Sequence, residues 1–330
     1  MRFRSLLLLA CFSFSTFSLL SQEMLILYPD TMEAAIKSYA DLRSQSGIYV
    51  RLSPLGSSHP TGSHDILRLI REANDSLALD YVLLVGPPAI LPPFRNALGS
   101  LSDYPYSLPD STGPRLAVGR LPSINRMQLI HYTKRVATIG VSTSRGKVCI
   151  LPATIDRSHA ADYCHDLSLR GINTKIISSS ELGKDSCELF IYIGQGSSQA
   201  WLDAGINVQN ADSLFRVSPS VILSIACSTA NILGSRSLPM KLMFDHKKLL
   251  NLIGCMGNCL LEESARLGLY IVAQWQAGKP IGKIWKEAER SYLHSGGDLE
   301  RMQHTLGEFI LWGDPSLIPF KKNPDHGQRK

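Results

Sequence analysis

A cysteine and a glutamine each follow closely on a short apolar run of the sequence. Gln195 comes two residues after the run 189–193 (LFIYI), and Cys227 comes two residues after the run 221–225 (VILSI). Apolar runs of this length, bounded by small and polar residues, are typical of buried strands. Ligands and catalytic groups of an open α/β sheet collect at the carboxyl ends of its strands. We therefore expect Gln195 and Cys227 to lie side by side at the ends of two strands.

A cysteine at the end of a strand has the chemistry of a nucleophile, and it needs a base beside it. A thiol with a pKa of about 8.5 is only a few per cent ionised at pH 7. A histidine normally increases that fraction and then protonates the leaving group. Here the partner position holds Gln195, whose amide has no pKa in a usable range. The pair therefore predicts a site that reacts slowly or not at all.

Apolar strand-like runs alternate with helical patterns along the chain, which predicts an α/β fold with a mostly parallel sheet. The expected strands are 24–28, 48–52, 81–85, 116–118, 148–151, 174–177, 189–193, 221–225 and 249–255, and the expected helices are 31–46, 64–74, 124–139, 158–169, 262–276 and 281–293. A Ser/Thr/Gly-rich stretch at 140–146 predicts a linker. We expect two subdomains, 23–143 and 144–320, each with a mostly parallel central sheet flanked by helices.

The composition is that of a globular protein and disfavours nucleic-acid binding. Hydrophobic residues make up 44% of the 330 residues, and the formal net charge of +6 is scattered rather than concentrated on one segment. Arg2 and Arg4 precede a short apolar stretch, so residues 1–22 predict a signal peptide. Anchoring as a lipoprotein at Cys11 is the alternative. No later segment is apolar enough to span a membrane, and residues 321–330 predict a disordered tail.

Six cysteines follow Cys11, and their spacing matches no metal or redox motif. Cys149 and Cys255 lie in strand-like runs, where cysteine acts as a small hydrophobe. For Cys255 and Cys259 we expect packing in the core or one local disulfide bridge. The sequence also has no phosphate-binding loop, no His-Glu-x-x-His motif and no complete dinucleotide fingerprint. We expect no cofactor and no metal.

Several segments, taken in their order, resemble the gingipain family of cysteine peptidases, which share a fold with caspases and legumains. The family's catalytic-histidine segment is similar to residues 192–197 (YIGQGS) with Trp201 downstream, and its nucleophile segment is similar to Ala226 and Cys227. Further similar segments are 80–86 with 91–93, 102–106, 117–121, 305–308 and 311–317. One departure is Pro87, where the family has an aspartate.

The resemblance implies a role for each of four residues. Cys227 occupies the nucleophile position and Gln195 the general-base position, where histidine is expected. The backbone N–H groups of Cys227 and Gly196 would form an oxyanion hole. Asp156 is the nearest candidate for the orienting or specificity acid of the family. His159, beside it, is a candidate for a displaced base, against its ordinary interpretation as a solvated residue at a helix start.

Two other features have structural explanations. Residues 312–315 (WGDP) predict a turn that ends the domain. Arg120 leaves two alternatives open, because it can pair with an acid between the subdomains or lie exposed.

The expected function is that of an exported gingipain-like domain that binds a peptide or protein but is catalytically impaired by Gln195. The first alternative is an active cysteine endopeptidase with Cys227 as nucleophile and a displaced base. The second alternative is a non-catalytic structural or secretion component, for which the sheet is only a scaffold.

Overall fold

The computed structural model describes residues 22–322 apart from short segments. These segments are 57–61, 97–98, 109, 111–115, 123–124, 140–142, 145, 154–155, 185, 216–218, 235 and 246–247. The expected signal peptide up to residue 21, with Cys11, and residues 323–330 of the expected tail lie outside the described part. Lys321–Lys322 (β17) pairs in parallel with Thr143–Ser144 (β7), so regular structure continues two residues into the segment expected as a tail.

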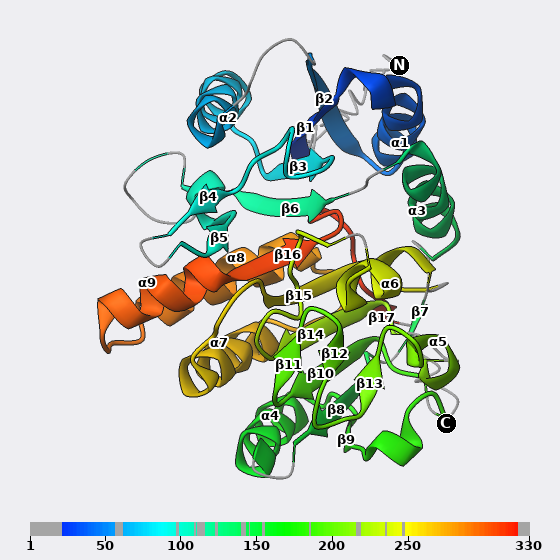
Figure 1. Cartoon of the computed structure of the whole chain (residues 1–330), viewed down its shortest axis with the longest axis vertical. Helices are drawn as coiled ribbons and strands as arrows, with labels where there is room; N and C mark the ends of the chain where they lie inside the picture. Colours follow the sequence, from blue (N-terminus) through cyan, green and yellow to red (C-terminus); the bar gives the residue numbers. More distant parts are fainter. Residues whose placement is uncertain are drawn as a thin grey trace, which may run out of the picture.

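A ten-stranded sheet forms the centre of the molecule, in the order β2-β1-β3-β6-β16-β15-β14-β10-β8-β9 (Figure 1). Its strands are β1 (Gln22–Pro29), β2 (Ile48–Leu55), β3 (Tyr81–Val85), β6 (Ala117–Leu121), β8 (Val148–Pro152), β9 (Thr174–Ile176), β10 (Leu189–Ile193), β14 (Val221–Ile225), β15 (Asn251–Cys255) and β16 (Phe309–Trp312). Short strands form separate small sheets, namely β4 (Phe94–Arg95) with β5 (Leu101–Ser102), and β11 (Gly196–Ser197) with β12 (Ala200–Trp201) and β13 (Ile206–Asn207).

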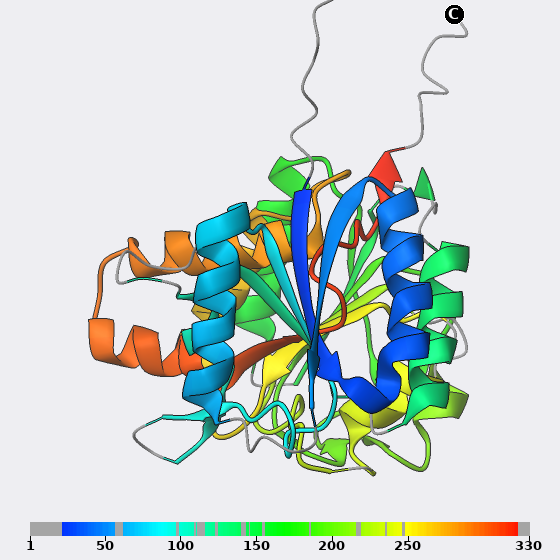
Figure 2. The same cartoon turned by 90° about the horizontal axis from the view of Figure 1, so that it is seen from above.

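Helices cover both faces of the sheet, as the view from above shows (Figure 2). One face carries α1 (Glu33–Gln45), α3 (Arg126–Ile139), α5 (Ala211–Leu214) and α6 (Leu238–Asp245). The other face carries α2 (Ser63–Leu77), α4 (Arg157–Leu169), α7 (Leu261–Ala273), α8 (Ile281–Leu293) and α9 (Leu299–Glu308). Short 3-10 turns are η1 (Asp30–Met32), η2 (Tyr104–Ser107) and η4 (Ser179–Glu181). All five residues of β3, β10 and β14 are buried, as expected for strands covered on both faces.

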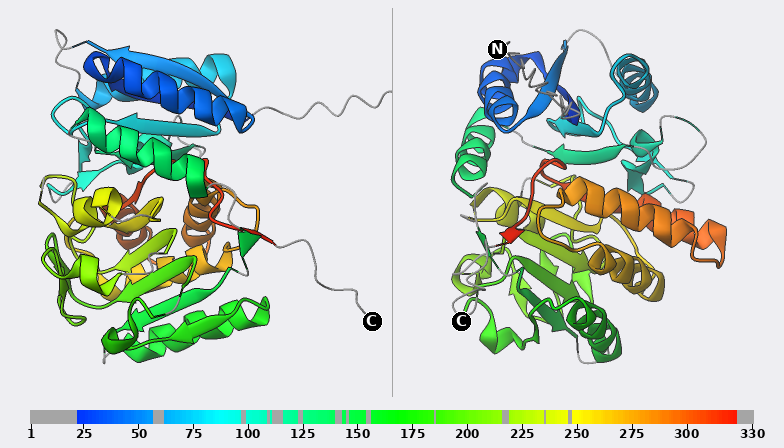
Figure 3. Two further views of the ribbon diagram at one scale, coloured as in Figure 1. Left: turned by 90° about the vertical axis from the view of Figure 1, so that its right-hand side faces the viewer. Right: turned by 180° about the vertical axis from the view of Figure 1, so that it is seen from behind.

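The sheet consists of two parallel blocks joined through β16. Strands β2, β1, β3 and β6 are parallel to one another, and so are β15, β14, β10, β8 and β9. Strand β16 is antiparallel to β15 and meets β6 at one register pair, Trp312 with Arg120. The predicted α/β fold with mostly parallel sheets is thus confirmed. The strands of both expected subdomains lie edge to edge in one sheet, and the two blocks follow one another along the long axis (Figure 3).

Strand β6 differs from its predicted form, and the difference decides the environment of Arg120. The sequence suggested a strand that stops at residue 118, but β6 continues through Arg120 to Leu121. The guanidinium of Arg120 is fully buried and donates two hydrogen bonds of 2.7 Å to the Asp103 carboxylate and one of 2.8 Å to the Leu91 carbonyl. Exposure of Arg120 is therefore excluded. Its acidic partner, Asp103, lies between β5 and η2, in the same expected subdomain as Arg120 and not in the other one.

The turn after β16 is structural, as its sequence predicted. Asp314 is fully buried, pairs with Arg43 of α1 at 3.0 Å and accepts the Ser316 N–H at 2.7 Å. The Tyr39 hydroxyl of α1 also donates to this carboxylate. Because these contacts connect the chain after β16 to the first helix, the turn fastens the two ends of the described chain together.

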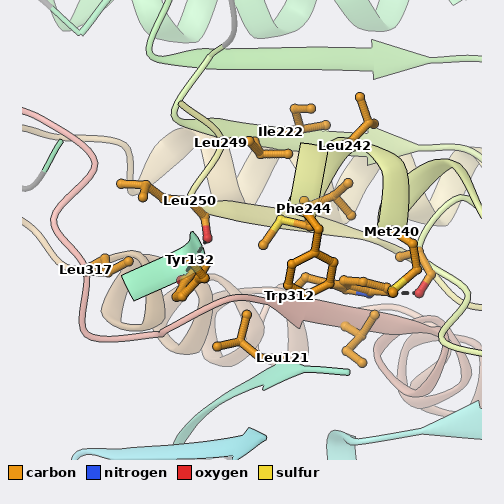
Figure 4. Close-up of a cluster of buried hydrophobic side chains, with 14 of the residues drawn as sticks. Leu121, Tyr132, Ile222, Met240, Leu242, Phe244, Leu249, Leu250, Trp312 and Leu317 are labelled. Carbon is orange, nitrogen blue, oxygen red and sulfur yellow. Dashed lines mark hydrogen bonds between the residues drawn. The ribbon is translucent and has the colours of Figure 1, made fainter. Parts of the chain in front are cut away.

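Trp312, the last residue of β16, lies in a dense apolar cluster with Leu121, Met240 and Phe244 (Figure 4). Its indole N–H donates to the Ala230 carbonyl at 2.9 Å. Ala230 follows Cys227 by three residues and donates its own N–H to the Cys255 carbonyl at 2.8 Å. This cluster therefore fixes the far end of the turn that carries Cys227.

Candidate active site

The parallel pairing of β10 and β14 brings the two predicted site residues to one edge of the sheet. Ile193 is in register with Ile225, and the Gly194 N–H donates to the Ile225 carbonyl at 3.1 Å. The chain therefore leaves β10 toward Gln195 directly beside the point where β14 leads to Cys227. This is the juxtaposition that the two apolar runs predicted.

The turn at Gly196 packs against the turn at Cys227 so closely that only glycine fits. A Cβ atom at Gly196 would lie 2.4 Å from the Thr229 side chain and 2.9 Å from the Cys227 carbonyl oxygen. Both distances are shorter than van der Waals contact. The close approach keeps the backbone next to Gln195 within reach of anything bound at Cys227.

The backbone of Gln195 is held on three sides, while the residue itself is exposed. Its N–H donates to the Asp203 carboxylate at 2.6 Å. Its carbonyl accepts the Tyr192 hydroxyl at 2.8 Å and the Leu202 N–H at 2.9 Å. Position 195 therefore has a fixed backbone and an exposed side chain, within the turn that packs against the Cys227 turn.

Trp201 connects the two turns through a buried hydrogen-bond chain. Its ring stacks on Tyr192, with ring centroids 5.0 Å apart, and its indole N–H donates to the Ser224 hydroxyl at 2.9 Å. Ser224 in turn contacts the Thr229 hydroxyl at 2.7 Å, and Thr229 donates to the Ala226 carbonyl at 2.9 Å. Tyr192 bonds the Gln195 carbonyl, so Trp201 and its partners brace both turns.

This brace can be measured with a double-mutant cycle of Trp201→Phe and Ser224→Ala. Each single variant should lower the free energy of unfolding by about 1–3 kcal/mol, because it leaves a buried polar group without its partner. We expect a coupling free energy of about 1 kcal/mol from urea titrations of the four proteins. The control is Trp285→Phe, because Trp285 is a buried tryptophan that takes no part in this hydrogen-bond chain. Its effect on the free energy of unfolding should be additive with that of Ser224→Ala. Additive effects of Trp201→Phe and Ser224→Ala would contradict the brace.

The Cys227 thiol lies against a second thiol, that of Cys259. The two sulfur atoms are 3.7 Å apart, and the Cys227 thiol donates to the Cys259 carbonyl at 3.6 Å. The contact with Cys259 raises the pKa of Cys227 most, and burial raises it further. For Cys259 the contact with Cys227 lowers the pKa, but Cys255 and burial raise it more, to about 12. Both groups are therefore thiols at neutral pH.

The residue after Cys227 has a left-handed backbone. Ser228 has a φ of 58°, which is uncommon outside glycine, and its N–H donates to the Gly257 carbonyl at 2.8 Å. Backbone strain of this kind is held only where surrounding contacts fix it, and it clusters at functional sites. The strained residue thus follows Cys227 directly, in the turn after β14.

The cysteine predictions can now be compared with the structure. Cys149, Cys164, Cys187, Cys227, Cys255 and Cys259 are all free thiols. Core packing, the first alternative for Cys255, fits its full burial, and the local bridge to Cys259 is not formed. No group of three or more His, Cys, Asp or Glu side chains in the described ranges is arranged to hold a metal ion.

Comparison with known proteins gives the family. The model of peptidase family C25 matches residues 18–320, most of the chain. The chain belongs to peptidase family C25. No curated protein sequence matches it. The resemblance of separate segments to gingipains therefore agrees with a family match over most of the chain.

Solved structures share the fold of this C25 chain. The crystal structure of the Arg specific cysteine proteinase gingipain R (RGPB) matches with a TM-score of 0.77 and 17% identity, over 90% of this chain and 78% of that one. The complex of Porphyromonas gingivalis RgpB pro- and mature domains matches with a TM-score of 0.77 and 17% identity, over 90% and 79%. A structure described only as a protease matches with 0.76 and 16%, over 92% and 80%. At these identities the likeness concerns the fold.

None of the helices in the described part of the C25 chain is long and apolar enough to cross a bilayer.

Asp156 and His159 lie at the start of α4, after the strand that borders β10. Asp156 is 2% exposed, and within the described structure one of its carboxylate oxygens has no hydrogen-bond partner. Burial raises the pKa of Asp156, His159 lowers it and Asp203 raises it, so that it lies above the usual value. The buried Nδ1 of His159 also has no partner there. The structure thus places Asp156 near Asp203 and so near the Gln195 turn.

A cavity of about 600 Å³ opens at the same edge, beyond β8. Its walls include Ala153, Arg157, Ile177, Glu181 and Asp203. Asp203 both lines this cavity and accepts the Gln195 N–H, so the cavity adjoins the site. Sequence reasoning missed Asp203, because the hairpin that carries it has strands of only two residues. The only signal available was its place two residues after Trp201.

Proposed function

We propose that this C25 chain is an exported, gingipain-like domain that binds a peptide or protein at the Cys227 edge and cleaves it slowly or not at all. The observation that carries the proposal is the fixed backbone of the exposed residue Gln195, in the turn that packs against the Cys227 turn. In this interpretation Gln195 occupies the general-base position, and Cys227 occupies the nucleophile position. Export is inferred from the basic and apolar N-terminal segment.

The expected impairment follows from the steps of cysteine-peptidase chemistry. The thiol must lose its proton before sulfur attacks the peptide carbonyl, and the leaving amine must then gain a proton. The Gln195 amide does neither at neutral pH. Its N–H groups and carbonyl can still hydrogen-bond a bound peptide. The contact with Cys259 also keeps Cys227 protonated, which reinforces the loss of reactivity.

Other parts of a peptide-binding site are supported by geometry. The backbone N–H groups of Cys227 and Gly196 are our candidates for binding a carbonyl oxygen, because the two turns are in close contact. Asp156 is our candidate for the orienting or specificity acid, since its buried carboxylate has an oxygen without a partner in the described structure. The cavity lined by Asp203 offers room for a side chain of the bound peptide.

An active peptidase with a displaced base is the second candidate, and His159 favours it. Its Nδ1 is buried without a partner in the described structure, next to the acid Asp156. A displaced base would need such a histidine with a nearby acid. A structural or secretion component remains the third candidate.

The test uses a fluorescent peptide library, fluorogenic peptides and an electrophilic peptide ketone on the wild type and on Cys227→Ala. We expect peptide binding by both proteins, and turnover by the wild type that is slow or no greater than that of Cys227→Ala. Ketone labelling at Cys227 should be slow at neutral pH and should still increase above pH 9, because the raised pKa keeps the thiol protonated until then. Wild-type turnover that is lost in both Cys227→Ala and His159→Ala would establish the second candidate instead. Absence of peptide binding would support the scaffold candidate.

A further inference from the structure

Two turns that lie side by side bring Cys259 to Cys227. Strands β14 and β15 are parallel neighbours, with Ser224 in register with Gly254, so the turns that follow them leave the same edge of the sheet. The Ser228 N–H donates to the Gly257 carbonyl at 2.8 Å and ties the two turns together. Cys227 and Cys259 lie within these turns, outside regular secondary structure.

The two thiols are close enough to be joined with little movement. Their sulfur atoms are 3.7 Å apart, and a disulfide has a sulfur–sulfur distance of about 2.05 Å. Both residues are only half-buried, so a small oxidant can reach them. Within the described residues the Cys227 thiol contacts Cys259, whereas the nearby Cys255 thiol contacts Cys259 and the Gly257 carbonyl. Cys259 is therefore the direct partner of the Cys227 thiol.

We propose that Cys259 is a resolving thiol, which forms a reversible disulfide with Cys227 when the site meets a peroxide. In the first step the Cys227 sulfur attacks one oxygen of the peroxide and the O–O bond breaks. The leaving hydroxide takes up the thiol proton as water, and Cys227 becomes a sulfenic acid. In the second step the Cys259 sulfur attacks that sulfenic sulfur and the S–S bond forms. The S–O bond breaks, and the hydroxyl leaves as water with the Cys259 proton. Two thiols and one hydrogen peroxide thus give one disulfide and two waters.

Such a disulfide would remove the Cys227 thiol from the peptide-binding edge and would protect it from irreversible oxidation. A dithiol or an excess of monothiol would restore it by exchange. The chemistry depends only on the two cysteines. Its consequence for peptide binding rests on the function proposed above, and the two can be tested separately.

The structure supplies a matched control pair. Cys149 and Cys187 are also in contact, as the effect of Cys149 on the pKa of Cys187 indicates, but they are only 2% and 8% exposed. If proximity alone governed oxidation, this pair would be linked as readily as Cys227 and Cys259. If access is also required, it stays reduced. Cys164, half-buried in α4, is the control for a thiol on another element.

The purified full chain, Cys259→Ser and Cys164→Ser are exposed to hydrogen peroxide at pH 9, where more of the raised-pKa thiols is ionised than at neutral pH. The remaining thiols are then blocked with N-ethylmaleimide, and peptides are mapped by mass spectrometry. For the wild type and Cys164→Ser we expect a Cys227–Cys259 linked peptide, lighter by two hydrogen atoms and lost on reduction. For Cys259→Ser we expect Cys227 to gain oxygen atoms that reductant does not remove. Equal oxygen uptake at Cys227 in the wild type and Cys259→Ser, without the link, would overturn the proposal. So would a link from Cys259 to Cys255 alone.

Peptide binding is measured on the same samples. Loss of binding on oxidation and its return on reduction would show that the disulfide closes the proposed site. A disulfide in a chain that never binds peptides would uphold the thiol pair and overturn the proposed function. Peptide binding without any disulfide would support the proposed function and overturn the proposed thiol pair.

Discussion

Gln195→His is expected to turn the Cys227 edge into a reactive site. General acid–base catalysis contributes roughly 10²–10⁴-fold, so ketone labelling at Cys227 and peptide turnover should rise by a factor in this range. Hydrogen bonds between the backbone of residue 195 and Asp203, Tyr192 and Leu202 fix its position, so the new imidazole would be attached to an already ordered backbone. Labelling should increase as pH rises through the imidazole pKa, about 6.5, because only the neutral ring accepts the thiol proton.

The control for this variant is Gln199→His, which adds a histidine to the same hairpin on another exposed residue. It should leave the labelling rate unchanged, since the gain depends on position 195 and not on an added imidazole. Gln195→Ala should also stay inert, because the native amide supplies no base. The rate constants come from quenched labelling followed by intact mass. If Gln195→His is labelled as slowly as the wild type, with the free energy of unfolding unchanged, the rest of the site has also lost its catalytic geometry.

The juxtaposition of Gln195 and Cys227 could be predicted because each comes two residues after a short, mostly apolar run that forms a fully buried strand. In a parallel sheet such strands are buried on both faces, and their carboxyl ends share one edge. Asp203 and Cys259 could not be predicted in the same way. Asp203 is placed by strands of two residues, too short for any periodicity, and Cys259 depends on the order of β14 and β15 in the sheet.

The end of the chain shows a second limit of sequence reasoning. Strand β16 begins at Phe309 directly after α9, which ends at Glu308, so the apolar run continues from a helical pattern without a break. Periodicity does not separate strand from helix in so short a run. Neither α9 nor β16 was therefore expected. In the structure the Asp298 side chain caps α9 by accepting the N–H groups of Glu300 and Arg301. Strand β16 continues directly from α9 and runs antiparallel to β15. Local residue types do not encode this direction.

Arg120→Met is expected to destabilise the fold by about 3–5 kcal/mol, because it leaves the Asp103 carboxylate buried without its cation. The guanidinium is fully buried and makes hydrogen bonds to both oxygens of Asp103 and to the Leu91 carbonyl. Arg120 is also the residue of β6 in register with Trp312 of β16. The loss should therefore weaken the junction between the two blocks of the sheet as well as the loop that carries Asp103.

Two comparisons separate the missing cation from the missing contacts. Arg68→Met breaks the exposed pair of Arg68 with Asp65 on α2 and should cost at most about 1 kcal/mol, since solvent screens that pair. The double variant Arg120→Met with Asp103→Leu removes both charges, so it should recover most of the stability lost by Arg120→Met alone. Urea unfolding monitored by tryptophan fluorescence measures all four proteins. If the double variant is as unstable as the single one, the hydrogen bond to Leu91 and the shape of the guanidinium, rather than its charge, hold β6 in place.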